Sequence, residues 1–125
     1  MPRPIRAVVN PAAISANIIK IKQLLEGVAV MPVVKANGYG HGLDRIFPGL
    51  LQADALAILE IEGVARLRTL GWTKPLVLLE GCFDQADLHR AVELHCDWVV
   101  HSSDQLHDLE KLANKPLGYK PKIYL

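Results

Sequence analysis

The strongest constraint on this chain is a regular alternation of apolar and amphipathic segments. Five runs rich in valine, isoleucine and leucine recur at intervals of 24, 20, 21 and 25 residues, ending at Lys35, Leu59, Leu79, Val100 and Leu125. The runs are continuous rather than alternating, as is typical of parallel strands that are covered on both faces. This period predicts a series of βα units, which builds either a doubly wound sheet or a (β/α)8 barrel.

The amphipathic segments carry the signals of helix ends. The first helix is expected to begin after Asn10, a suitable N-cap, with Pro11 at its first position. Asp84 is expected to cap a later helix, and Ser102 another, in a capping box with Gln105. Apolar residues at helical spacing predict the buried faces of these three helices, which are Ile14, Ile18, Ile21 and Leu25; Leu88, Ala91 and Val92; and Leu106, Leu109 and Ala113.

The length of the chain limits how much of such a fold it can form. A complete (β/α)8 barrel typically needs about 250 residues, whereas this chain has 125. A set of five parallel strands without partners at its outer edges would leave exposed edges, which proteins usually avoid. We therefore predict an α/β fold that corresponds to the first half of a (β/α)8 barrel, with the rest of the barrel absent from this chain.

Composition and charge argue against several classes of partner. The 14 basic and 13 acidic residues are interspersed and give a net charge of +1, so neither nucleic acid nor a membrane surface is indicated as a partner. The apolar runs are too short to cross a bilayer, and no apolar segment follows the basic N-terminus as it would in a secretory signal. Cys82 and Cys96 lack CxxC spacing and are expected to be free thiols of a cytoplasmic protein.

Residues 31–42, with the sequence MPVVKANGYGHG, are the main candidate for a functional site. Lys35 falls at the carboxyl end of the first strand, where ligands gather in parallel α/β folds. Partial burial there disfavours the ammonium form, so the amine can condense with an aldehyde to a Schiff base, as pyridoxal phosphate enzymes require. The glycines of the loop allow close backbone approach to a bulky ligand, and Tyr39 supplies a hydroxyl for a phosphate. From spacing alone, a surface lysine beside a flexible turn remains the alternative.

Other polar residues have simpler structural explanations. His41 is expected to brace the loop through hydrogen bonds. The remaining histidines are scattered, and no HExxH or Cys/His cluster has the spacing of a zinc site, so no metal is predicted. Cys82 has no evident base partner, while capping and solvation explain Glu80 and Asp84. Two tryptophans that flank strands are expected to fill the core: Trp72 and Trp98.

The motif VVKANGYGHG resembles the pyridoxal-lysine signature of alanine racemases, in which a Lys-Ala-Asn triplet is followed by a small residue and Tyr-Gly-His-Gly. The surrounding segments are similar too. NPAAISANIIKIKQLL resembles the opening helix of that family, LAILEIEGVARLRTLG its second strand and helix, and PLVLLEGCF its third strand. The likeness extends over essentially the whole chain, but it covers only the N-terminal portion of a complete racemase.

The resemblance implies a (β/α)8 barrel that binds pyridoxal 5'-phosphate, followed by a mostly β domain that is absent from this chain, in a homodimer. Residues 1–10 would form a strand that packs with that β domain, and residues 11–125 would form the partial barrel. Lys35 would hold the cofactor as a Schiff base and act as a catalytic acid/base. Tyr39 would hydrogen-bond the phosphate, and Leu79 would line the cofactor cavity, although a leucine at a strand end is explained equally well as core.

The function implied by the resemblance is interconversion of L-alanine and D-alanine, which supplies D-alanine for the peptidoglycan of the bacterial cell wall. In the family, the second acid/base and the arginines near cofactor and substrate lie downstream of these residues, so this chain alone is expected to be inactive. Two alternatives stay open. One is another racemase or decarboxylase of the same barrel class, and the other is a non-catalytic partial barrel that binds the cofactor, other phosphate ligands or a partner chain.

Overall fold

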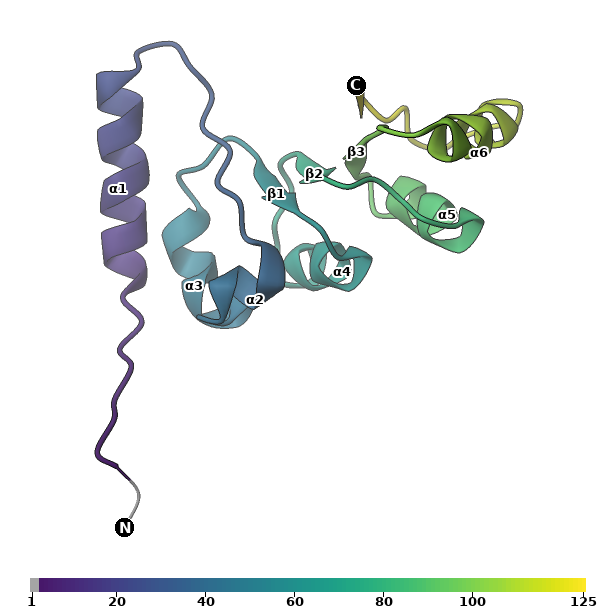
Figure 1. The fold of residues 1–125 in the computed structure, drawn as a ribbon. Coiled ribbons are helices and arrows are strands. Elements are labelled where there is room, and N and C mark those ends of the chain that lie inside the picture. Colours follow the sequence, from purple (N-terminus) through teal and green to yellow (C-terminus); the bar gives the residue numbers. More distant parts are fainter. Residues whose placement is uncertain (1–2) are drawn as a thin grey trace.

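The computed structural model describes residues 3–125 and shows the predicted succession of strands and helices (Figure 1). Helix α1 (Pro11–Leu24) is followed by an extended segment, the short turn α2 (Lys35–Tyr39) and helix α3 (Leu43–Leu50). Strands and helices then alternate, in the order β1 (Leu56–Ile58), α4 (Ile61–Thr69), β2 (Leu76–Leu78), α5 (Gln85–Glu93), β3 (Asp97–Val99), α6 (Ser103–Ala113) and β4 (Ile123–Tyr124).

The strands form one parallel sheet in the order β1-β2-β3-β4. The expected first strand pairs only through Val33, which forms a parallel bridge with Ala57 of β1. Its backbone continues the ladder, because Val34 N–H donates to the Ala57 carbonyl at 2.8 Å and Ala57 N–H donates to the Pro32 carbonyl at 3.0 Å. The parallel segments therefore lie side by side in sequence order. This is the arrangement of consecutive barrel strands rather than the reordered sheet of a doubly wound fold.

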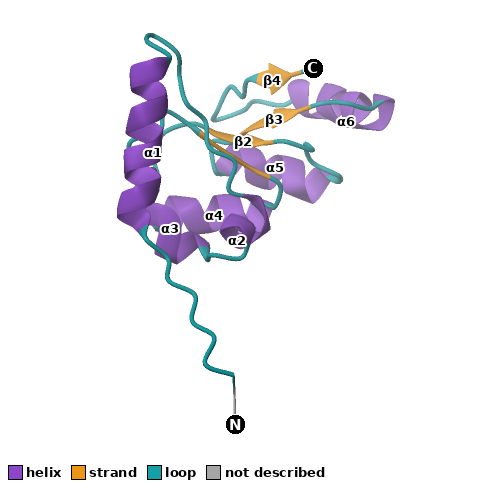
Figure 2. Cartoon of the chain, turned by 60° about the vertical axis from the view of Figure 1, so that its left-hand side comes forward, coloured by secondary structure: helices purple, strands orange, loops and turns teal. Residues whose placement is uncertain are grey.

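Helices α4, α5 and α6 lie along one face of the sheet and leave the other face open (Figure 2). Strand residues that face these helices are almost fully buried, with exposed fractions of 0% for Ile58 and 1% for both Leu78 and Trp98. Trp72 is buried in the same cluster, so both tryptophans fill the core as predicted. The face of the sheet opposite α4, α5 and α6 is called the open face below.

The helix ends follow the sequence signals closely. Each predicted N-cap accepts a hydrogen bond from the backbone N–H three residues further on, and these caps are Asn10, Asp84 and Ser102. Gln105 departs from the capping box, because its side-chain oxygen accepts a hydrogen bond from His101 N–H at 2.9 Å rather than from Ser102. Helix α3 forms although Pro48 lies inside it. Gly49 allows α3 to pack closely on α1, because a Cβ at this position would lie only 2.4 Å from the Pro11 carbonyl oxygen.

The predicted buried face is confirmed for α5 and partly wrong for α1 and α6. On α1, Ile18 is buried, but Ile21 and Leu25 are 42% and 52% exposed. Helix α1 packs against α3, which has 8 residues against its own 14, so the end of α1 extends past its partner. On α6, Leu109 packs against the core as predicted, but the buried residues are Gln105 and Leu112 in place of Leu106 and Ala113. The side chain of Gln105 is buried because its amide nitrogen donates hydrogen bonds to the carbonyl oxygens of Glu80 and Cys82 in the loop after β2.

Residues 3–10 form no regular structure, and their first part extends away from the body of the molecule (Figures 1 and 2), whereas Val9 packs against the core. The expectation that residues 1–10 form a strand against a β domain stays a prediction, and its first two residues lie outside the described part of the chain.

Arg68 connects the segments that lead into β2 and β3. Its guanidinium donates hydrogen bonds at 2.8 to 2.9 Å to the carbonyl oxygens of Trp72, Lys74, Leu94 and His95. We expect Arg68→Met to lower the free energy of unfolding by about 3 kcal/mol, because these carbonyls lose a charged donor. Arg68→Lys should recover only part of it, since an ammonium lacks the planar fork. Urea unfolding followed by circular dichroism measures both, and a methionine variant as stable as wild type would contradict this role.

Asp54 connects α1 to the first strand segment. Its carboxylate accepts hydrogen bonds from Lys22 Nζ and from Val30 N–H, each at 2.7 Å. The Lys22 bond, with a further contribution from Val30, lowers the pKa of Asp54 below its ordinary value of 3.8. Stabilisation by Asp54 is therefore present in full above that value and is lost as the pH falls through the lowered pKa.

This linkage predicts that Asp54→Asn lowers the urea midpoint at neutral pH. The difference from wild type should narrow progressively below about pH 4, where the wild-type carboxylate also becomes protonated. A difference that stays constant from neutral pH down to pH ~2 would show that the charge of Asp54 contributes nothing.

Candidate functional site

A row of residues occupies one level of the open face at the carboxyl ends of the strands. The sheet register pairs Ile58 with Leu78, Leu78 with Trp98, and Val99 with Tyr124. Because side chains alternate between the two faces of a strand, the residue after each core residue belongs to the open face. Counting on two residues from the Val33–Ala57 bridge puts position 35, where turn α2 begins, next to Leu59. We call this set the open-face row, and it consists of Lys35, Leu59, Leu79, Val99 and Tyr124.

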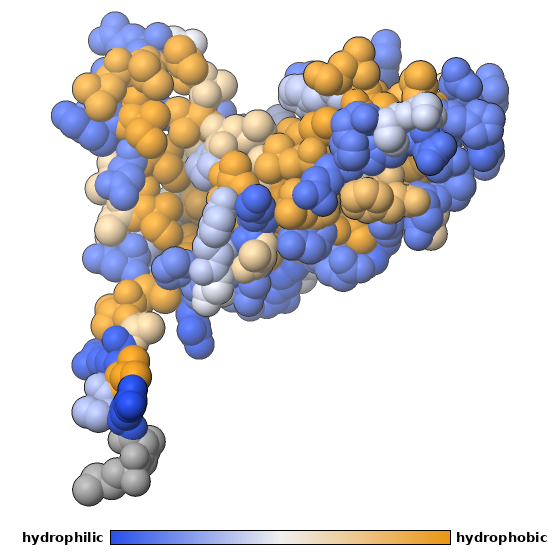
Figure 3. Space-filling view, in the orientation of Figure 1, coloured by the Kyte–Doolittle hydropathy of each residue, from blue (hydrophilic) through white to orange (hydrophobic). Residues whose placement is uncertain are grey.

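The open-face row is more accessible than the core residues beside it. Leu59, Leu79 and Val99 are half-buried, and Tyr124 is 44% exposed. The space-filling view shows a hollow between α1 and the C-terminal strands, with apolar side chains gathered at its floor (Figure 3). The members of the row between Lys35 and Tyr124 are therefore all aliphatic and partly accessible.

Lys35 begins a turn of left-handed backbone. Ala36, Asn37 and Gly38 have φ between 52° and 63° with ψ between 44° and 49°, and Tyr39 has φ 54°. These are the dihedral angles of a left-handed helix, which costs an L-residue roughly 1–2 kcal/mol. Strain of this kind persists only where the surroundings hold it, and it clusters at ligand-binding sites. The sequence indicated special backbone at the glycines, but it did not reveal that three residues with side chains adopt it.

Side chains around the left-handed turn hold it in place. Asn37 Oδ1 accepts a hydrogen bond from the first backbone N–H of α3 at 2.9 Å. Glu60 Oε1 accepts one from Ala36 N–H at 3.2 Å. His41 Nδ1 lies 2.9 Å from the Gly38 carbonyl oxygen, as expected of a residue that braces the loop. Asn37 and Glu60 were not singled out from the sequence, although Glu60 directly follows a predicted strand end.

The amine of Lys35 is not engaged by the protein. Lys35 is half-buried, and its amine takes part in no hydrogen bond or ion pair among residues 3–125. The amines of Lys22, Lys74 and Lys111 bind carboxylate or carbonyl oxygens, whereas those of Lys20, Lys115, Lys120 and Lys122 are unengaged like that of Lys35 but lie away from the strand ends of the open face or on exposed segments. An unengaged amine at a strand end is available to react with an aldehyde.

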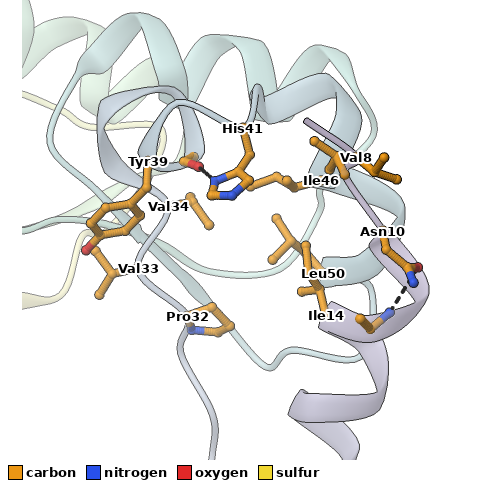
Figure 4. A pocket seen from close by; sticks show the side chains of 13 residues that line it. Val8, Asn10, Ile14, Pro32, Val33, Val34, Tyr39, His41, Ile46 and Leu50 are labelled. Atoms are coloured by element: carbon orange, nitrogen blue, oxygen red, sulfur yellow. Dashed lines mark hydrogen bonds between the residues drawn. The ribbon is translucent and has the colours of Figure 1, made fainter. Parts of the chain in front are cut away.

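The structure brings the other two predicted site residues to the same end of the sheet. Tyr39 is 59% exposed, and it lines the same cavity as Val33 (Figure 4). Leu79 lies two strands from Lys35 in the open-face row, which corresponds to roughly 10 Å at the usual strand spacing. A cavity of about 480 Å³ lies between the turn, α1 and the first strand segment, and Tyr39 lines it but Lys35 does not. The roles of Lys35, Tyr39 and Leu79 in cofactor binding stay predictions.

These features fit pyridoxal phosphate as a ligand. Lys35 offers a free amine for the aldehyde, Tyr39 an accessible hydroxyl for the phosphate, and the open-face row an aliphatic surface for the ring. The left-handed turn leaves the backbone at Gly40 unobstructed, since a Cβ there would meet nothing within 4 Å. The donor set and the shape of this end of the sheet are therefore compatible with the cofactor.

Other candidate chemistries find little support. Cys82 and Cys96 are buried, and burial raises the pKa of each thiol to about 12, so both stay protonated and unreactive. Residues 3–125 contain no cluster of three or more His, Cys, Asp or Glu side chains suited to a metal ion. Within the same residues, every helix is too short or too polar to serve as a membrane span.

Comparisons with known proteins agree on one family. Residues 9–125 match the model of the alanine racemase N-terminal domain. The alanine racemase of Leptothrix cholodnii is 43% identical over 106 residues, which cover 85% of this chain and 28% of that protein. Biosynthetic alanine racemase from Pseudomonas aeruginosa aligns with a TM-score of 0.83 at 31% identity, over 94% of this chain and 32% of that one.

A third similar protein was solved with its cofactor. The crystal structure of alanine racemase from Bartonella henselae with covalently bound pyridoxal phosphate aligns with a TM-score of 0.75 at 25% identity, over 83% of this chain and 30% of that one. This chain thus spans about 30% of the length of the relatives it matches.

Proposed function

The chain belongs to the alanine racemase family, whose N-terminal domain it matches, and we propose that it is the cofactor-holding part of an enzyme that interconverts L-alanine and D-alanine. The observation that carries the proposal is the position of Lys35. Its unengaged amine lies at the carboxyl end of a barrel strand and begins a strained turn that neighbouring side chains hold in place. The covalently bound pyridoxal phosphate of the Bartonella henselae relative supports the choice of cofactor.

Each predicted site residue receives a role in the proposal. Lys35 holds pyridoxal phosphate covalently through its side-chain nitrogen, and its freed amine moves the proton at the α-carbon of alanine on one face. Tyr39 donates a hydrogen bond to the phosphate, and Leu79 lines the cavity around the ring. When bound, the cofactor delocalises the negative charge that develops at the α-carbon. The strained backbone after Lys35 limits the positions that its amine can take.

The proposal extends beyond this chain for the rest of the reaction. Racemisation requires a second acid/base on the opposite face of the α-carbon, and we assign it to the part of the protein that aligned relatives have beyond the matched region. By itself, the chain is expected to form no D-alanine. We further propose that the whole protein works as a cytoplasmic homodimer and supplies D-alanine for peptidoglycan, in keeping with the biosynthetic relative from Pseudomonas aeruginosa.

A reconstitution assay tests the racemase proposal. The chain is mixed with pyridoxal phosphate, L-alanine and the segment of the Leptothrix cholodnii racemase that follows the matched region, and D-alanine is measured with D-amino-acid oxidase. We expect D-alanine from the mixture and none from either part alone. Preferential racemisation of another amino acid, or release of carbon dioxide from an amino acid, would place the chain in a different branch of the barrel class.

A further inference from the structure

We propose that Glu60 is a positioning residue of the cofactor site, because its carboxylate holds the peptide unit that joins Lys35 to Ala36. The inference rests on the proposed function, since it adds a residue to the site in which Lys35 holds pyridoxal phosphate. Glu60 lies outside the motif of residues 31–42, directly after the neighbouring strand β1 and before α4.

The backbone N–H groups on either side of Lys35 are both bound to the β1 segment. Val34 N–H donates to the Ala57 carbonyl oxygen at 2.8 Å, and Ala36 N–H donates to Glu60 Oε1 at 3.2 Å. Hydrogen bonds of a parallel ladder recur every two residues along a strand, so the next acceptor would be the main-chain carbonyl two residues after Ala57. The Glu60 carboxylate supplies this acceptor instead, at the point where the ladder ends.

Glu60 is also the N-cap residue of α4, but its side chain does not cap that helix. An N-cap side chain usually accepts a hydrogen bond from a backbone N–H in the first turn of its own helix, as those of Asp84 and Ser102 do. Among residues 3–125, the Glu60 side chain makes no bond of this kind. A local rule of helix capping is thus broken where the side chain binds the turn, as is common at functional sites.

The bond to Glu60 matters because Ala36 has an unfavourable backbone conformation. Its φ of 52° and ψ of 49° lie in the left-handed region, which alanine avoids and glycine adopts readily. Without the bond, the peptide unit after Lys35 can relax to an ordinary conformation, and the direction of the Lys35 side chain changes with it. Glu60 therefore fixes the direction in which the Lys35 amine extends from the strand end.

The test compares how Glu60→Ala, Glu60→Gln and Glu62→Ala bind pyridoxal phosphate. Glu62 is a matched control, because it is an acidic residue in the first turn of α4 whose ion-pair partner is Arg90 of α5. Each chain is titrated with pyridoxal phosphate and reduced with borohydride, and the fraction of labelled Lys35 is measured by peptide mass spectrometry. Circular dichroism verifies that all variants fold.

We expect Glu60→Ala to raise the concentration for half-maximal Lys35 labelling about fivefold, in line with the loss of one hydrogen bond. Glu60→Gln keeps an acceptor oxygen and should raise it by about twofold at most, and Glu62→Ala should leave it unchanged. If Glu60→Ala labels Lys35 as wild type does, or if Glu60→Gln is as weak as Glu60→Ala, the inference is wrong while the proposed function stands. If wild-type Lys35 takes no label, both are overturned.

Ala36→Gly provides a second test, which separates positioning from a general loss of stability. Glycine adopts the left-handed conformation readily, so the turn should persist in this background without the bond to Glu60. We expect Glu60→Ala to raise the half-maximal concentration by about twofold at most in the Ala36→Gly chain, against about fivefold in the wild-type chain. An equally large effect in both backgrounds would show that Glu60 does not act through the conformation of Ala36.

Discussion

Lys35→Ala is expected to abolish the covalent incorporation of pyridoxal phosphate into the chain. The reason is chemical, since only an unprotonated amine can attack the cofactor aldehyde, and the alanine side chain has none. The other lysines either bind oxygen atoms of the protein or lie outside the open-face row. Visible absorbance after addition of the cofactor, followed by borohydride reduction and intact-mass measurement, gives the result.

Two controls separate loss of the amine from loss of the fold. Lys20→Ala removes an exposed lysine on α1 and is expected to leave the incorporation unchanged. Lys35→Arg keeps the positive charge and much of the length but cannot form the covalent link, so it should behave like alanine. Incorporation into Lys35→Ala at the wild-type level would refute the assignment of the cofactor to this residue.

Gly81→Ala is expected to lower the free energy of unfolding by about 3 kcal/mol, since overpacking against backbone and left-handed strain both contribute. Gly81 has φ +74°, and a Cβ there would lie 2.2 Å from the Val99 carbonyl oxygen and 2.8 Å from Gln105 Nε2. The same Gln105 nitrogen donates to the Glu80 carbonyl at 2.7 Å. The added methyl group therefore disturbs the hydrogen bond between Gln105 of α6 and the loop after β2. This loop directly follows Leu79 of the open-face row.

Gly71→Ala is the matched control for this prediction. Gly71 has φ +101°, but a Cβ there would meet nothing within 4 Å, so only the backbone strain of about 1 kcal/mol is expected. Urea unfolding measures the stability of both variants. Gly81→Ala should also weaken Lys35 labelling, whereas Gly71→Ala should not. Equal destabilisation by the two substitutions would show that the collision at Gly81 is relieved at no cost.

Much of the fold could be predicted because it depends on local patterns. Continuous apolar runs at a steady period gave the strands, and capping residues such as Asp84 and Ser102 gave the helix starts. The buried face of α6 was predicted only in part. Leu109 packs against the core as expected, but an apolar pattern cannot anticipate a buried glutamine. Gln105 is only 8% exposed since its amide binds the Glu80 and Cys82 carbonyls. Such contacts depend on the tertiary arrangement.

The candidate site was predicted from one motif and only in part. The motif pointed to Lys35 and Tyr39 as candidates, because reactive amines and phosphate-binding hydroxyls have a recognisable chemistry, and their roles stay predictions. It did not reveal the left-handed backbone of Ala36 and Asn37, since nothing in their side chains requires positive φ.

Peptide mapping of the wild-type chain tests most directly whether the Lys35 amine holds the cofactor. The chain is incubated with a small excess of pyridoxal phosphate, reduced with borohydride, digested and analysed by mass spectrometry. The account predicts one pyridoxyl phosphate group on the peptide that contains Lys35. A label spread over exposed lysines such as Lys20 and Lys120, with none on Lys35, would contradict it.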